Sequence, residues 1–213
     1  MQKNKIGFLT GIVGSTGTGK SCIVKSMIES LSNICVFDIQ EEYGLKGLHE
    51  YYKENIIPTK FSVIPAYYDR LKFVRIVELS KGFTFVLEGS TGYIDNDFFK
   101  SKDGKRLISC IVAKRHYQKE GGGGNNYILV FHSVASIPKS LWPFIDFFFL
   151  FPTSEKNFES NEELINRAHE EVSRNVEIPY KDFKISDYRV VVRTPHGLKN
   201  LHYIANYTGK RIV

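Results

Sequence analysis

The chain has 213 residues, of which 42% are hydrophobic and 24% are charged. This length fits one domain, and this composition is typical of a folded globular protein and excludes a largely disordered one. Lysine and arginine outnumber aspartate and glutamate by 29 to 23, a net charge of +6 that permits a polyanionic partner without showing one. The three cysteines, Cys22, Cys35 and Cys110, are widely spaced without a C-x-x-C pair, which argues against disulfides or a zinc site and indicates a reducing compartment.

We expect no membrane segment. The chain opens with MQKNK, and no signal-peptide cleavage site follows the apolar stretch behind it. The most apolar run, Leu141–Pro152, is shorter than the roughly 20 residues of a membrane helix and contains Asp146. We interpret this run as a buried strand with its lead-in.

Strands and helices are predicted to alternate along residues 6–151. Strands are expected at 6–13, 34–39, 63–64, 83–87, 127–131 and 145–151. Helices are expected at 21–31, 69–79 and 105–117, where apolar residues recur at helical spacing. Residues 40–60 give no clear signal. Apolar strands that alternate with helices predict an α/β fold, with a parallel sheet covered by helices on both faces.

The end of the chain has a different pattern. Residues 159–171 are acidic and predict a surface helix, while residues 188–192 and 202–207 predict a terminal hairpin outside the main sheet. No repeat and no linker separates two domains. We therefore interpret residues 1–153 as a core and residues 154–213 as a helix and small β extension of the same domain.

A glycine-rich segment, GSTGTGKS at residues 14–21, matches the pattern G-x-x-x-x-G-K-[ST] between a predicted strand and a predicted helix. The alternative is a merely flexible loop, but both the spacing and the context favour a phosphate-binding loop, whose N–H groups and helix N-terminus bind phosphates. Lys20 is expected to reach the β- and γ-phosphates, and the Ser21 hydroxyl to bind Mg²⁺. The chain is therefore expected to bind ATP and Mg²⁺. The residues predicted to bind the nucleotide are Gly14, Ser15, Thr16, Gly17, Thr18, Gly19, Lys20, Ser21 and Cys22.

Glu88 directly follows the apolar strand at 83–87. A phosphate-loop enzyme needs a carboxylate at the end of a neighbouring strand to hold Mg²⁺ and to polarise the attacking water. Burying a charged side chain there costs free energy unless the charge is paired or metal-bound. This cost favours the role in Mg²⁺ binding and catalysis over that of a simple strand-end acid. We predict that Glu88 is both catalytic and a metal ligand. Gly89 follows, so the usual pair of acids is reduced to one.

Together these motifs resemble the FtsK/HerA superfamily of DNA-pumping ATPases, and within it the short genome-packaging ATPases of viruses and phages. The resemblance spans residues 6–153. The similar segments are GSTGTGKS (14–21), FDIQEEYG (37–44), FVLEGSTGYI (85–94) and AKRHYQ (113–118) with the following YILVFHS and SIPKSLW. Two positions depart from the family, Gly89 in place of a second acid and His132 in place of a common Gln.

The resemblance implies a RecA-like (ASCE) P-loop fold with strand order 5-1-4-3-2, and roles for several polar residues. Arg115 would reach a neighbouring subunit's γ-phosphate, or belong to a solvated basic face. His132 would contact the γ-phosphate or its water, or be a structural histidine. Asp38 and Glu42 would end an edge strand away from Mg²⁺, as a capping or surface pair, or Glu42 would replace the acid missing at Gly89.

Basic residues are concentrated between positions 100 and 119. We interpret residues 100–106, which are polar and contain Gly104, as a loop that could face a channel and contact the phosphate backbone of DNA, although such charge runs are often only solvated. The basic residues are Lys100, Lys102, Lys105, Arg106, Lys114, Arg115 and Lys119.

The resemblance thus implies an ATP-driven DNA translocase that packages a viral genome. It implies a homo-oligomeric ring, sequence-independent DNA contacts, a capsid vertex or portal-like partner, and a place in the host cytoplasm or the virion. Two other functions remain open on the residues alone. One is a nucleoside or nucleotide kinase, for which the arginine-rich lid is not found. The other is a degenerate nucleotide-binding assembly factor, which Gly89 favours.

Overall fold

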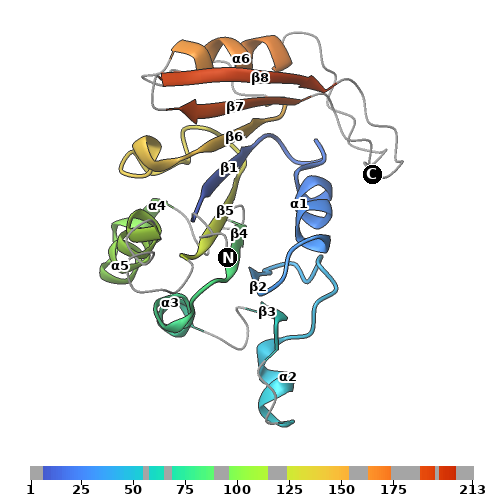
Figure 1. Ribbon diagram of the computed structural model, residues 1–213, viewed down its shortest axis with the longest axis vertical. Coiled ribbons are helices and arrows are strands. Elements are labelled where there is room, and N and C mark those ends of the chain that lie inside the picture. Colours follow the sequence, from blue (N-terminus) through green and yellow to red (C-terminus); the bar gives the residue numbers. More distant parts are fainter. Residues whose placement is uncertain are drawn as a thin grey trace, which may run out of the picture. The chain divides into compact units, whose positions relative to one another are not determined.

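The computed structural model describes residues 7–54, 58–64, 69–88, 96–114, 124–153, 163–173, 188–194 and 197–204 (Figure 1). The chain divides into two compact units. The first unit holds Met1–Leu9 and Ser30–Leu129, and the second holds Thr10–Glu29 and Val130–Val213. Strands β1 (Leu9–Val13) and β5 (Asn126–Phe131) contribute residues to both units.

The first unit is a parallel sheet with helices that connect its strands. Its strands stand in the order β3-β2-β4-β5, and β2 pairs in parallel with both β3 and β4. The strands are β2 (Ile34–Phe37), β3 (Lys60–Val63) and β4 (Thr84–Glu88), beside β5. The helices are α2 (Leu48–Tyr52), α3 (Arg70–Leu79), α4 (Asn96–Lys100) and α5 (Lys102–Val112).

Aromatic side chains pack α3 onto the sheet of the first unit. The ring of Phe73 on α3 lies 4.6 Å from that of Phe37 on β2 and 6.5 Å from that of Phe85 on β4, and all three side chains are fully buried. Asp69 caps this helix by accepting the Lys72 N–H at 2.6 Å. The helical spacing predicted for residues 69–79 is therefore confirmed.

The position of β2 corrects one expectation. The resemblance implied that this strand lies at an edge, whereas β2 lies between β3 and β4. The edge position beside it belongs to β3, whose four residues KFSV are too few for a clear strand signal, so only residues 63–64 were expected as a short strand. On its other side β2 pairs with β4, so the end of β2 is next to the end of β4, where Glu88 stands.

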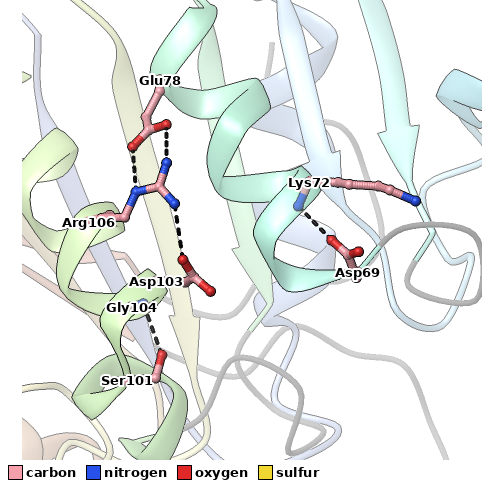
Figure 2. A network of polar contacts seen from close by, with 7 residues as sticks. All are labelled: Asp69, Lys72, Glu78, Ser101, Asp103, Gly104 and Arg106. Carbon is pink, nitrogen blue, oxygen red and sulfur yellow. Dashed lines mark hydrogen bonds and ion pairs between the residues drawn. The ribbon is translucent and has the colours of Figure 1, made fainter.

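Residues 100–106 comprise the end of α4, the cap residue Ser101 and the start of α5, so their interpretation as a loop is wrong. Lys100 ends α4, and Ser101 caps α5 by accepting the Gly104 N–H at 3.1 Å (Figure 2). Gly104, which suggested a loop, serves helix packing, because a Cβ there would lie 2.0 Å from the Phe98 carbonyl oxygen on α4. Without a side chain at this position, the two helices can approach closely.

The second unit has strands in the order β1-β6-β7-β8. β1 pairs in parallel with β6, and the β6–β7 and β7–β8 pairs are antiparallel. The strands after β1 are β6 (Phe147–Leu150), β7 (Tyr188–Thr194) and β8 (Gly197–Ile204). The helices are α1 (Lys20–Glu29), the short 3₁₀ helix η2 (Trp142–Phe144) and α6 (Glu163–Ser173), which packs against β7 and β8 (Figure 1).

The C-terminal hairpin exists but is not outside the sheet. β7 extends the sheet because it pairs with β6 along Phe147–Leu150, and α6 packs against it. Arg189 on β7 is only 5% exposed, and its side chain forms an ion pair with Glu171 of α6 at 2.6 Å. Within the described ranges, no helix has the length and apolar character needed to cross a membrane.

Candidate functional site

The phosphate loop lies in the second unit, between the end of β1 and the start of α1. Two backbone contacts anchor it: the Gly14 N–H donates to the Phe131 carbonyl at 3.2 Å, and the Ser15 N–H donates to the Pro152 carbonyl at 2.9 Å. Gly14 is sterically required, because a Cβ there would lie 2.5 Å from the Cβ of Phe151. The loop therefore packs directly against the residues at the ends of two strands, β5 and β6.

The interior of the loop is shaped by its small residues and by Lys20. Gly17 and Gly19 have φ values of +79° and +97°, a region that favours glycine. The Thr18 hydroxyl and the Lys20 ammonium both donate to the Ser15 carbonyl at 2.8 Å. Lys20 is only 6% exposed. The ammonium is thus folded back over its own loop, where a phosphate would replace the carbonyl as its partner.

The structure brings His132 close to this loop in the second unit. His132 follows β5 and is half-buried. Burial lowers the pKa of His132 below its ordinary value of 6.5, the Lys20 charge lowers it further, and a hydrogen bond with the Gly14 backbone partly opposes both. The imidazole is therefore neutral at neutral pH and lies close to Gly14 and Lys20 of the phosphate loop. This geometry suits the predicted contact with the γ-phosphate or its water.

The lowered pKa of His132 predicts a pH dependence of stability. Below about pH 6.5 the unfolded chain binds a proton that the folded His132 resists, so the free energy of unfolding should fall as the pH falls through this range. His132→Gln should weaken this dependence. Denaturant titrations of both proteins between about pH 5 and pH 8 measure it. Identical pH profiles would show that His132 does not contribute.

Glu88, the last residue of β4, is 6% exposed and belongs to the first unit. The Tyr43 hydroxyl donates a hydrogen bond to its Oε1 atom at 3.0 Å. Tyr43 itself is buried. Tyr43 belongs to the segment FDIQEEYG, whose linear pattern predicts no role for it, because nothing in that pattern shows that residues 43 and 88 meet.

The Asp38 carboxylate holds the backbone of Tyr43 through a hydrogen bond. The two oxygens of its carboxylate accept the N–H groups of Glu42 at 3.0 Å and Tyr43 at 3.1 Å, which confirms the capping alternative for this residue. Burial raises the pKa of Asp38, although these two hydrogen bonds partly counteract it. Glu42 is exposed. The structure therefore connects the FDIQEEY segment to Glu88 through Tyr43.

Most of the basic residues that the structure describes between 100 and 119 have structural partners. Arg106 of α5 forms a bidentate ion pair with Glu78 of α3, at 3.0 and 2.7 Å, and contacts Asp103 at 3.1 Å (Figure 2). Lys100 pairs with Asp97 at 2.9 Å, and Lys114 is buried. The remaining described lysines of this stretch, Lys102 and Lys105, are exposed on α5.

Some predicted residues are not brought together by the described structure. Arg115 and Gly89 lie outside the described residues, and the phosphate loop and Glu88 belong to different units. No group of three His, Cys, Asp or Glu side chains in the described ranges forms a ready metal site. Mg²⁺ in nucleotide sites is bound by few protein oxygens, with waters and phosphates completing its shell, which is the donor type that Ser21 and Glu88 offer.

A mostly parallel α/β sheet with a phosphate loop between its first strand and first helix defines a P-loop NTPase. Sequence comparison then narrows this class. The family described as "Helicase HerA, central domain" matches residues 9–206, so the chain belongs to this family. The match continues beyond residue 153, where the resemblance drawn from motifs ended. No curated protein matches the sequence.

Solved structures share the fold over nearly the whole chain. The genome packaging NTPase B204 of Sulfolobus turreted icosahedral virus 2, in complex with sulfate, is 13% identical, with a TM-score of 0.62 over 94% of this chain and 98% of B204. Its AMPPCP complex is 14% identical, with a TM-score of 0.58 over 94% of this chain and 99% of B204. EssC (ATPases 2 and 3) of Geobacillus thermodenitrificans is 15% identical, with a TM-score of 0.52 over 100% of this chain and 42% of EssC. The predicted fold class and the FtsK/HerA resemblance are confirmed.

Proposed function

We propose that the protein is an ATP-driven DNA translocase that packages a viral genome. The observation that supports this function best is that the HerA-family chain matches B204 over 94% of its own length and 98% of that of B204. EssC has the same fold, but this chain covers only 42% of it. The correspondence with B204 over nearly the full length of both chains therefore supports a packaging-type ATPase.

The proposed chemistry is hydrolysis of ATP with Mg²⁺. Backbone N–H groups of residues 16–19 and the N-terminus of α1 bind the phosphates, and Lys20 exchanges the Ser15 carbonyl for phosphate oxygens. Ser21 and Glu88 are the proposed protein ligands of Mg²⁺ and its waters. Glu88 also orients and deprotonates the attacking water, while neutral His132 contacts the γ-phosphate.

Two further proposals concern assembly and DNA. A homo-oligomeric ring would let Arg115 act on a neighbour's nucleotide, as arginine fingers do. Lys102 and Lys105 lie one turn apart on α5, where both point their charge into solvent and can contact phosphates of a DNA backbone without reading its sequence. A capsid vertex or portal-like protein is the proposed docking partner.

The test compares ATP hydrolysis with and without double-stranded DNA. We expect DNA to raise the rate, and the double variant Lys102→Glu/Lys105→Glu to reduce the ratio of the two rates toward one. The matched control, Lys72→Glu/Lys139→Glu, reverses two other exposed lysines and should keep the ratio. Raising the salt concentration should weaken the stimulation, because each phosphate contact releases counterions.

Other outcomes would overturn the proposal. DNA-independent phosphate transfer to a nucleoside or nucleotide would identify a kinase. Tight ATP binding without turnover, in the presence of DNA and in the assembled state, would identify a degenerate assembly factor. Equal loss of stimulation in both lysine variants would show that α5 is not a specific DNA contact.

A further inference from the structure

We infer that Tyr43 is a positioning residue for the Glu88 carboxylate and that Asp38 holds Tyr43 in that place. The inference rests on the proposed function only where it concerns hydrolysis by Glu88. The contacts themselves lie within the first unit and belong to segments separated by 45 residues.

The contact between the two side chains is short and shielded from water. The Tyr43 hydroxyl lies 3.0 Å from Glu88 Oε1, and the two residues are 9% and 6% exposed. A hydrogen bond to an ionised group in a place of low dielectric constant is stronger than one at the surface. The phenol therefore restrains the rotation of the carboxylate.

The backbone around Asp38 explains why Tyr43 reaches Glu88. β2 and β4 are parallel neighbours in the register Phe37↔Leu87, so Asp38 and Glu88 are the next residues at matching strand positions. After Asp38 the chain turns back, with Glu41 at a φ of +54°. Both oxygens of the Asp38 carboxylate are engaged, one by the Glu42 N–H and one by the Tyr43 N–H. The backbone N–H of Tyr43 is thereby tied to the end of β2.

These contacts of the first unit hold the Glu88 carboxylate in one orientation. A residue that accepts a proton from water must keep one orientation, since a small misplacement lowers the rate steeply. Gly89 follows Glu88, so no second acid at that position can share this task. The alternative is that Tyr43 only satisfies a buried carboxylate and contributes to stability. The two roles predict different kinetics.

The principal variant is Tyr43→Phe, which keeps the buried ring and removes the hydroxyl. We expect kcat for ATP to fall roughly 10-fold and KM to stay within about two-fold, because the lost contact orients the carboxylate rather than the nucleotide. Tyr127→Phe is the matched control, a tyrosine on β5 that is 1% exposed and stacks on Phe85 at 5.8 Å.

A second variant tests the role of Asp38. Asp38→Asn keeps the shape of the side chain but retains only one oxygen, so one of the two N–H contacts is lost. We expect kcat to fall as in Tyr43→Phe, by a smaller factor, while KM stays within about two-fold. Adding Asp38→Asn to Tyr43→Phe should then lower kcat little further, because Asp38 acts on Glu88 through the tyrosine hydroxyl.

A measurement without turnover separates this inference from the proposed function. The Glu88 carboxyl ¹³C signal, assigned by its loss in Glu88→Gln and measured at one neutral pH, should change its chemical shift in Tyr43→Phe and keep it in Tyr127→Phe. If the wild-type protein hydrolyses no ATP, the proposed function fails and this chemical shift still decides whether the contact exists. An unchanged chemical shift, or a variant that loses only thermal stability while kcat stays constant, would overturn the inference.

Discussion

Glu88→Gln is expected to lower the rate of ATP hydrolysis by at least about 100-fold while ATP binding changes little. Glutamine keeps the size of the side chain and an oxygen that can accept the Tyr43 hydroxyl at the position where the carboxylate accepts it at 3.0 Å. It cannot accept a proton from the attacking water at neutral pH. The loss should therefore appear in kcat, measured by phosphate release, and not in the dissociation constant measured by fluorescent ATP analogues.

The control for this variant is Glu50→Gln, the same change at an exposed position on α2 in the first unit. It should hydrolyse ATP like the wild-type protein. If Glu88→Gln retained most of its activity, another acid would perform the chemistry, and Glu42→Gln would be the next variant. Glu42 is exposed and its backbone is joined to Asp38, so it stands in the same segment as Tyr43.

Lys20→Met is expected to weaken ATP binding by about 10- to 100-fold and to abolish measurable hydrolysis, since a buried charged hydrogen bond to phosphate is lost. The Lys20 ammonium is 2.8 Å from the Ser15 carbonyl, inside the loop that would surround the phosphates. AMP, which has no β- or γ-phosphate, should bind the variant as it binds the wild-type protein. Calorimetry with ATP, ADP and AMP measures the difference.

The matched control is Lys25→Met, the same substitution further along α1 at a half-exposed position. It should bind ATP normally, because its charge is beyond the loop. Equal weakening for AMP and ATP in Lys20→Met would mean that the loop had collapsed rather than lost a phosphate contact. In that case Lys20 would have a structural role, and the assignment of the β- and γ-phosphates to it would be wrong.

The sequence determined those features of the protein that depend on neighbouring residues. GSTGTGKS needs only its own spacing and its place between a strand and a helix, and the structure has it between β1 and α1 with Gly14 pressed on Phe151. The buried strand before Glu88 and the helix over residues 69–79 were predictable for the same reason, because their apolar periodicity is local. The family resemblance followed from these local motifs.

Only the tertiary structure decided which distant segments meet. β2 pairs with both β3 and β4, and this pairing brings Tyr43 into contact with Glu88. The order of strands in a sheet does not affect the local periodicity of apolar residues, so the sequence did not show this contact. Gly104 suggested a loop, whereas it allows α4 and α5 to pack, and Arg106 belongs to an ion pair with Glu78 rather than to a free basic surface. The sequence shows the chemistry of each residue. The partners of that residue depend on long-range packing, which cannot be read from a single sequence.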